Sequence, residues 1–473
     1  MATVYYVSPY RITVPLNATE SIVYSTLTTS LIVLENDILQ KVFNDHDYCD
    51  ADLCSELCEM GFLTVEKHEQ LDLLREARNE VLNADTGITG VTIAPTMACN
   101  ARCYYCFERG ARWGTMSEQT ADAVADFLVK GCKQKKLYIA WFGGEPLLAP
   151  SIIDRITMRL QAAGIAVEST ITTNGILLDA QMRSRLERWG TYRVQITLDG
   201  IGSRYNRIKS YVGIKGNPFD IVMENIQGLF DLGGVSVHIR LNYESTNRCQ
   251  IEETFKYIKT RFGENENLYL YGAPLDMPSI KGYSEFDEDE GKLFLDVLHL
   301  SLDNGYRNDE LDFRQGPNSS AEYNAALGAL MLAPFPAPCL MTNRWRYVID
   351  DRGLLYKCQK HLGKASFSCG DVFSGVQKNE VYSRYTTDQL HDKACEDCFM
   401  LPICQGGCNA NRLLYGSKFA CPPSKTIAED LVRAYYDYLV GESEILDVYG
   451  PQEKGTSNEG NLQSHSEEGT QRT

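Results

Sequence analysis

The sequence predicts an α/β protein built around a parallel sheet with crossover helices. From residue 90 onward, short apolar runs alternate with helical stretches six times, which is the pattern of successive βα units. Two cysteine- or glycine-rich motifs directly follow the first two apolar runs. Six such units make either an open doubly wound sheet or a partial barrel, and both place chemistry at the carboxyl ends of the strands.

Residues 1–85 are predicted to form a separate module with short strands followed by helices. Gly61 is placed to end the second of these helices. The expected strands are 10–16, 21–27 and 30–34, with a turn at 17–19, and the expected helices are 35–44, 50–60 and 65–83. This order suggests a winged-helix-like module.

The βα units occupy residues 86–310. The apolar runs expected as strands are 91–95, 137–142, 167–173, 192–198, 235–242 and 267–271. The helices expected between and after them are 118–132, 150–163, 179–189, 220–232, 249–262 and 287–303.

The remaining chain is divided by composition. Residues 311–338 are expected to be a linker that ends in a proline-rich stretch, and residues 339–440 a cysteine-rich domain with short strands and a helix at 424–440. Residues 441–473 have few large apolar side chains towards their end and are expected to be a disordered tail.

Composition limits the class of function. The chain has 473 residues and a formal net charge of −17, which argues against nucleic acid as the main partner because phosphate binding needs a basic surface. It contains no apolar run long enough to span a membrane and no recognisable secretory signal, so a cytoplasmic protein without a membrane partner is expected.

Sixteen cysteines in a protein expected in a reducing compartment indicate metal ligands more than disulfides. Cys99, Cys103 and Cys106 form C-x3-C-x2-C. Three thiolates can hold three irons of a [4Fe–4S] cluster and leave one iron open to a small molecule. A zinc site completed by a distant residue is the alternative.

The cysteine loop, with Tyr105 just before the last cysteine, resembles that of the radical S-adenosylmethionine (SAM) enzymes, and Gly143-Gly144-Glu145-Pro146 matches their GGEP motif. The resemblance implies a partial (β/α)6 TIM-type barrel. It also implies that SAM chelates the open iron and is split into a deoxyadenosyl radical that abstracts hydrogen from a substrate.

The same resemblance implies residues that contact SAM. Tyr105 would lie near the adenine, Glu145 would accept from the methionine ammonium, and Arg240 and Asn242 would bind the carboxylate and ribose. The implied cofactor-binding residues are Tyr105, Gly143, Gly144, Glu145, Pro146, Thr173, Asn174, Thr197, Asp199, Arg240 and Asn242. Ordinary turns are the alternative for the Asn-Gly and Asp-Gly pairs. No catalytic acid or base is indicated.

The second cysteine group resembles the SPASM extension of radical SAM enzymes, which implies two auxiliary [4Fe–4S] clusters and so three in all. The implied outer ligands are Cys395, Cys398, Cys404 and Cys421, and the implied inner ligands are Cys339, Cys358 and Cys408. Cys369 is a candidate fourth inner ligand, although an open or substrate-bound iron is favoured. Two zinc sites are the alternative. The other cysteines are expected to be structural, and His361 to lie at the surface.

SPASM-containing radical SAM enzymes chiefly modify peptides and proteins, and residues 1–85 resemble the element with which peptide-maturing enzymes bind a leader as an added strand. DNA binding and a purely structural role are the alternatives for this module. The resemblance implies a maturase that crosslinks a ribosomally made precursor peptide, with a thioether favoured over carbon–carbon or carbon–oxygen links, and a flavodoxin or ferredoxin as electron donor. A formylglycine-generating sulfatase maturase and a non-catalytic iron–sulfur electron carrier or redox sensor are alternative functions.

Overall fold

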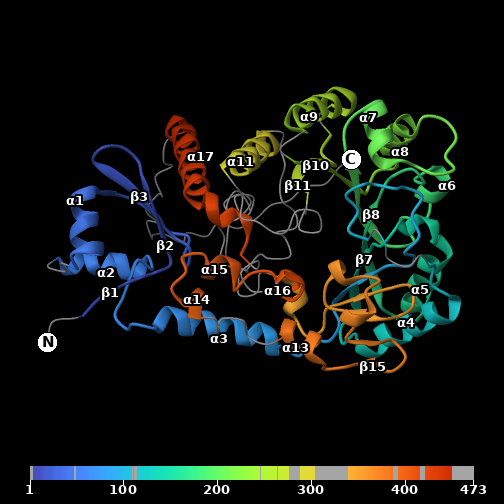
Figure 1. The fold of residues 1–473 in the computed structure, drawn as a ribbon, viewed down its shortest axis with the longest axis horizontal. Coiled ribbons are helices and arrows are strands. Elements are labelled where there is room, and N and C mark those ends of the chain that lie inside the picture. Colours follow the sequence, from blue (N-terminus) through green and yellow to red (C-terminus); the bar gives the residue numbers. More distant parts are fainter. Residues whose placement is uncertain are drawn as a thin grey trace, which may run out of the picture.

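One large, mostly parallel sheet organises the middle of the protein (Figure 1). The computed structural model describes residues 4–46, 50–108, 110, 114–244, 247–263, 265–275, 288–303, 339–386, 393–415 and 421–449. The strands of this sheet are β6 (Gly90–Ile93), β7 (Lys136–Trp141), β8 (Ala166–Thr173), β9 (Thr191–Leu198), β10 (Ser236–Tyr243), β11 (Leu268–Pro274), β12 (Tyr347–Ile349) and β13 (Leu355–Tyr356).

The six expected parallel strands are confirmed. Strands β6 to β11 pair in sequence order and all run in parallel, so their carboxyl ends lie at one edge. This arrangement is that of a partial barrel rather than a sheet whose strand order reverses. The apolar residues of these strands and of the covering helices form one continuous core.

Crossover helices follow the strands as expected, with one correction. The helices are α4 (Glu118–Gly131), α5 (Pro150–Ala162), α6 (Ala180–Arg183), α7 (Gly202–Lys209), α8 (Pro218–Leu232), α9 (Arg248–Phe262) and α11 (Glu288–Asp303). The helix expected at 179–189 is shorter, because only α6 is helical and the chain continues as tight turns. Trp189 at the end of these turns is buried in the core, and its indole donates to Asp154 at 2.8 Å. Helix α7 was not expected.

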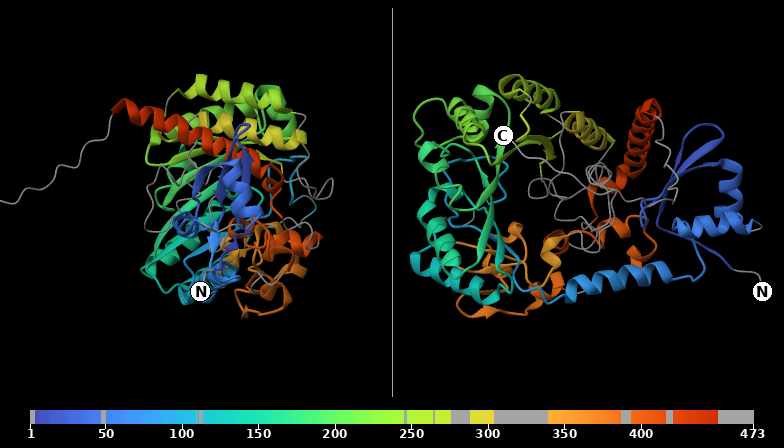
Figure 2. Two further views of the ribbon diagram at one scale, coloured as in Figure 1. Left: turned by 90° about the vertical axis from the view of Figure 1, so that its left-hand side faces the viewer. Right: turned by 180° about the vertical axis from the view of Figure 1, so that it is seen from behind.

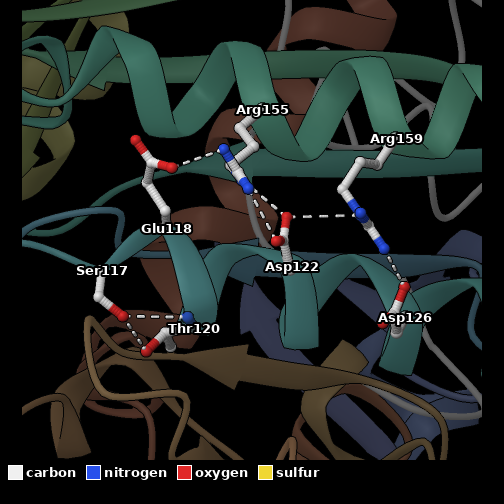
Figure 3. A network of polar contacts seen from close by, with 7 residues as sticks. All are labelled: Ser117, Glu118, Thr120, Asp122, Asp126, Arg155 and Arg159. Atoms are coloured by element: carbon white, nitrogen blue, oxygen red, sulfur yellow. Dashed lines mark hydrogen bonds and ion pairs between the residues drawn. The ribbon is translucent and has the colours of Figure 1, made fainter.

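Ion pairs hold α4 against α5 on the outer face of the barrel (Figure 3). The Arg155 guanidinium donates to both carboxylate oxygens of Asp122, at 2.7 and 2.8 Å, and Arg159 donates to Asp126 at 2.6 Å. Ser117 caps the start of α4 by accepting from the Thr120 amide. These contacts are exposed to water, so they set the register of the two helices more than they add stability.

The N-terminal module, defined as residues 1–85, contains the strands and helices that its sequence predicts. Its elements are β1 (Tyr6–Val7), β2 (Arg11–Pro15), β3 (Glu20–Ser25), β4 (Leu31–Glu35), α1 (Asn36–Leu39), a π-helical turn at Gln40–Asn44, α2 (Ala51–Glu59), β5 (Leu63–Thr64) and α3 (Glu69–Asn83). Helix α3 begins four residues later than expected, because the chain turns at 65–68 after β5, which pairs with β1.

The cysteine-rich region, defined as residues 339–421, is joined to the main sheet. Strand β12 pairs in parallel with β6, and β13 pairs antiparallel with β12. Its other elements include β14 (Gly370–Asp371), β15 (Gly375–Val376), α13 (Glu380–Thr386), α14 (Lys393–Glu396), α15 (Leu401–Cys404) and α16 (Asn409–Tyr415). The sequence predicted short strands here but not their place in the sheet.

The last helix, α17 (Ala428–Tyr449), packs against β2 and β3 of the N-terminal module (Figures 1 and 2). It corrects the expected boundary at residue 441, because Ile445 and Leu446 continue the helical apolar pattern past Gly441. The expected linker at 311–338 and the tail beyond residue 449 lie outside the described residues. Within the described part of the chain, every helix is too short or too polar to cross a membrane.

Candidate functional site

The first cysteine loop lies at the carboxyl edge of the sheet, directly after β6. Its backbone is fixed at both ends: the Glu145 amide donates to the Ala98 carbonyl at 2.8 Å, and the Arg102 amide donates to the Lys209 carbonyl at 2.7 Å. The Asn100 carbonyl accepts from the Val212 amide at 2.8 Å. Segments far apart in the sequence therefore hold this loop in place.

The three thiols of this loop share one environment. Burial raises the pKa of Cys99 to about 11, and the nearby charges of Glu145, Cys103 and Cys106 add to that shift. Burial likewise raises the pKa of Cys106, with a contribution from Cys103. Thiols whose ionisation is unfavourable next to one another are stabilised as thiolates by a bound cation.

The glycines of the GGEP motif leave room for this loop. A β-carbon on Gly143 would lie 2.6 Å from the Thr96 carbonyl oxygen, and one on Gly144 would lie 2.3 Å from the Ala98 carbonyl oxygen. Gly143 also has a φ of +105°, which other residues rarely adopt. The pair is therefore required by the close approach of the cysteine-loop backbone.

Glu145 lies fully buried beneath the loop and connects two strands. One carboxylate oxygen accepts from the Thr173 hydroxyl at 2.7 Å and the Leu147 amide at 3.1 Å, and the other accepts from the Asn174 amide at 2.8 Å. Burial raises its pKa despite these donors. A carboxylate has about four acceptor positions, and these donors occupy three of them. Pro146 follows, buried, in a short 3-10 turn.

A second polar cluster surrounds Asp199, at the end of β9. One Asp199 oxygen accepts from the Tyr105 hydroxyl at 2.6 Å and lies 2.9 Å from the Lys209 ammonium. The other accepts from the Asn242 amide at 3.0 Å, and Asn242 in turn accepts from Arg240 at 3.0 Å. Four residues expected near SAM are thus connected in one network.

Lys209, in this network, was missed by the sequence analysis because α7, which carries it, was not expected. Burial alone would lower the pKa of Lys209, but Asp199 and Tyr105 outweigh this and hold it well above its ordinary value. Burial raises the pKa of Tyr105. The cluster therefore contains a buried ammonium–carboxylate pair, and the neutral Tyr105 hydroxyl is hydrogen-bonded to both groups.

Asn174 joins the Glu145 cluster to the cysteine loop. Its side-chain amide donates to Asn100 at 2.7 Å, and its carbonyl accepts from the hydroxyls of Tyr205 and Tyr211. Thr197 lies half-buried near the end of β9. The structure thus brings the expected residues to one edge of the sheet.

Seven of the other cysteines lie in two separate groups. Burial raises the pKa of Cys404 to about 12, and the charges that raise it further are those of Cys398, Cys395 and Cys421. This set of four is the expected outer group.

The inner group is equally distinct. Burial raises the pKa of Cys358 to about 12, and the thiols that add to this shift are Cys339 and Cys408. Cys369 instead lies fully buried in the hydrophobic core, where its thiol donates to the Leu355 carbonyl at 3.4 Å. Cys369 therefore lies in a packing environment, and the inner group has three thiols.

His361, expected at the surface, is fully buried. Its ring stacks on Phe367 with centroids 4.4 Å apart, and its Nε2 lies 2.8 Å from the Tyr385 hydroxyl. Burial lowers the pKa of His361 to about 4, so it is neutral. The structure places it beside the inner group as a packing residue. Of the cysteines expected to be structural, Cys54 is buried and Cys249 is exposed, whereas Cys49 lies outside the described residues.

The donor chemistry of the three groups fits iron–sulfur clusters. Each is composed of thiols, in sets of three, four and three, and soft thiolate ligands suit such clusters. Across the described residues, no three His, Cys, Asp or Glu side chains are grouped to hold a single metal ion.

Comparison with known proteins gives a family match for the central part of the chain. Residues 93–258 match the model of the Radical SAM superfamily. The radical SAM cyclopropyl synthase TigE of Paramaledivibacter caminithermalis is 22% identical over 456 residues, which cover 86% of this chain and 89% of TigE. The mycofactocin maturase MftC of Mycobacterium tuberculosis is 24% identical over 334 residues, which cover 68% of this chain and 78% of MftC.

Two solved structures show the same fold. AnSMEcpe with bound AdoMet aligns with a TM-score of 0.57 at 16% identity, covering 75% of this chain and 99% of that one. Streptococcus suis SuiB bound to its precursor peptide SuiA aligns with a TM-score of 0.50 at 16% identity, covering 89% of this chain and 99% of that one.

Proposed function

Because residues 93–258 form a radical SAM domain, we propose that this enzyme matures a ribosomally made precursor peptide by installing an oxidative intramolecular crosslink. The observation that carries this proposal is a three-thiol loop held against the GGEP turn, in a chain that also has two further thiol groups. TigE and MftC, whose names describe modification chemistry and maturation, align over most of the chain.

Cys99, Cys103 and Cys106 would hold a [4Fe–4S] cluster, with SAM at the iron that lacks a thiolate. Together these groups supply a carbon radical that can take a hydrogen atom from a substrate. Glu145 keeps one acceptor position for an ammonium group. Asp199 and Tyr105 would form a polar wall beside SAM, and Arg240 with Asn242 would extend that wall.

Two auxiliary clusters would occupy the other thiol groups. Cys395, Cys398, Cys404 and Cys421 would hold the outer one, and Cys339, Cys358 and Cys408 the inner one. Three thiols leave one inner position for a substrate ligand, since Cys369 donates elsewhere. Closing a crosslink after hydrogen abstraction releases one proton and one electron, and these clusters would accept the electron. A flavodoxin or ferredoxin would supply the electron that starts each cycle.

The leader of the precursor would add to the edge of β4. Among the described residues, β4 pairs only with β3. The Ser25 amide donates to the Ser30 carbonyl and the Asn36 amide donates to the Thr19 carbonyl, so alternate residues of β4 bond inward. The residues between them, including Val33, turn their backbone N–H and C=O groups outward. Val33 is also 37% exposed, which leaves an apolar edge for another strand.

A thioether from a substrate cysteine is the favoured product. The second candidate is carbon–carbon closure, which the similarity to a cyclopropyl synthase over 86% of this chain favours. Either link removes two hydrogens from the peptide: one as an atom passed to the deoxyadenosyl group, and one as a proton.

Mass spectrometry of a small peptide encoded beside the gene, co-expressed with the enzyme under anaerobic conditions and then alkylated, tests this proposal. A loss of two hydrogens per link with alkylation-resistant cysteines indicates a thioether, and the same loss with free thiols indicates carbon–carbon or carbon–oxygen closure. Cys99→Ala should abolish both the mass change and deoxyadenosine formation. Cys249→Ala is the matched control, because Cys249 is exposed and lies outside all three groups. Unchanged deoxyadenosine formation by the Cys99→Ala protein would contradict the proposal.

A further inference from the structure

The N-terminal module rests on the segment that carries three of the four outer thiols, residues 395–405. The Tyr10 hydroxyl donates to the Glu396 carbonyl at 2.8 Å, and the Thr26 hydroxyl donates to the Phe399 carbonyl at 2.6 Å. Tyr10 and Leu401 also belong to one small apolar cluster. A module that contacts main-chain carbonyls depends on the conformation of that segment rather than on its side chains.

Helix α3 makes the deepest of these contacts. It runs beneath α14 and α15 in the view of Figure 1. Arg78 of α3 is 1% exposed, and its guanidinium donates to the Gln405 carbonyl at 2.9 Å. A long cationic side chain is rarely buried so fully unless its partner is fixed.

Gln405 begins a short bridge, residues 405–407, that joins Cys404 of the outer group to Cys408 of the inner group. All three bridge residues have positive φ: +50° for Gln405, +84° for Gly406 and +83° for Gly407. A residue with a β-carbon rarely adopts this conformation. Hydrogen bonds to the bridge carbonyls can hold it there.

A second arginine completes the support. Arg412 donates to the Gly406 carbonyl at 2.9 and 2.7 Å, and its guanidinium also lies 3.9 Å from the Cys395 sulfur. Successive carbonyls of the bridge are thus held by guanidinium groups from two different parts of the chain. Ordinary capping of α15 by a cation would explain one such contact, but α15 has only four residues and a small dipole.

We propose that Arg78 is a positioning residue for the two auxiliary clusters, through which the N-terminal module fixes the bridge between their ligands. This inference rests on the auxiliary clusters of the proposed function. Removing the Arg78 donor frees the Gln405 carbonyl, so Cys404 and Cys408 lose their fixed separation. The outer group, which the module contacts directly, is then the one that loses iron.

The test uses the full chain with Cys99→Ala, reconstituted anaerobically, so that only auxiliary iron is measured. This parent should hold about eight irons, as two [4Fe–4S] clusters require. Adding Arg78→Gln should halve the iron to about four and change the electron paramagnetic resonance spectrum of the reduced protein. Arg78→Lys, which keeps a cationic donor, should restore the iron and most of the parent spectrum.

Two control variants separate this role from general packing. Arg75→Gln removes a contact of the same helix with the same segment, the pair with Glu396 at 3.1 Å, but leaves the bridge untouched and should match the parent. Gln405→Gly removes the weaker contact of Arg78 with Gln405 Oε1 at 3.4 Å but keeps the carbonyl contact at 2.9 Å, so it should also match the parent. If Arg78→Gln fails to fold, Arg78→Met, which keeps a long unbranched side chain but has no donor, should show the same loss of iron.

The outcomes distinguish the two proposals. A parent without iron overturns both the auxiliary clusters and this inference. A parent with about eight irons whose iron and spectrum are unchanged by Arg78→Gln overturns the inference alone. Equal iron loss in Arg75→Gln and Arg78→Gln also overturns it, because the effect would then come from module packing rather than from the bridge.

Discussion

The Lys209 ammonium lies 2.9 Å from the Asp199 carboxylate, and each side chain is only 4% exposed. The pair joins the end of β9 to the end of α7, and the Lys209 carbonyl also accepts from the cysteine loop. One buried ion pair therefore connects the loop backbone to the polar wall beside it. Breaking such a pair costs more than the pair itself contributes, because one charge is left buried alone.

Asp199→Asn should reduce the free energy of unfolding by about 3–5 kcal/mol, because Lys209 keeps its charge without a partner. The double variant Asp199→Asn with Lys209→Met removes the orphan charge and should recover most of that loss. Urea denaturation of both proteins measures the difference, and equilibrium dialysis of SAM should show weak binding in both. A cost below about 1 kcal/mol for the single change would contradict the buried-pair interpretation.

Gly143→Ala should prevent Cys99, Cys103 and Cys106 from holding their cluster, because the added β-carbon would lie 2.6 Å from the Thr96 carbonyl oxygen. We expect about a one-third loss of total iron, with the iron of the other groups retained. Gly164→Ala is the matched control: Gly164 also has a positive φ, but a β-carbon there meets no atom within 4 Å. Equal iron loss in both variants would assign the effect to backbone conformation rather than to the loop contact.

Val33→Pro should prevent a peptide strand from adding to β4 without disturbing β3, because the lost N–H faces outward. The amount of crosslinked peptide in the co-expression experiment should fall at least about ten-fold. A loss of about 1.4 kcal/mol in the free energy of leader binding is enough for that change, because it lowers the affinity ten-fold. Val33→Thr keeps the N–H and should behave as the parent. Full crosslinking by the Val33→Pro protein would place the leader elsewhere.

His238 should make the protein less stable as pH falls. Burial lowers its pKa to about 3, whereas the unfolded chain has the ordinary value near 6.5, so the unfolded state binds more protons between these values. The contribution of His238 to the free energy of unfolding is therefore constant above pH 6.5 and falls below it, by up to about 1.4 kcal/mol per pH unit. His238→Phe keeps the stacking on Tyr269 and should flatten the fall in melting temperature between pH 7.5 and 5.5. An equal fall in both proteins would contradict this assignment.

The parallel strands could be predicted because each is a continuous apolar run bounded by turn residues. Strand β12 could not, since three residues carry too little periodicity and its partner β6 lies far away in sequence. His361 was expected at the surface but is buried by stacking on Phe367, a tertiary contact that no sequence motif indicates. The first thiol loop was predictable because Cys99, Cys103 and Cys106 lie close together in the sequence, whereas Lys209 reaches Asp199 only through an unexpected helix.

The pairing of β12 with β6 has a consequence for synthesis of the chain. Tyr347 pairs with Val91, a separation of 347 − 91 = 256 residues, so the contact order of this edge is high. At about 5–20 residues per second, β6 leaves the ribosome about 13–50 seconds before its partner exists. During that time the strand leading into the first cysteine loop has an open edge. A nascent chain of this kind needs protection from aggregation until residues 347–349 have been made.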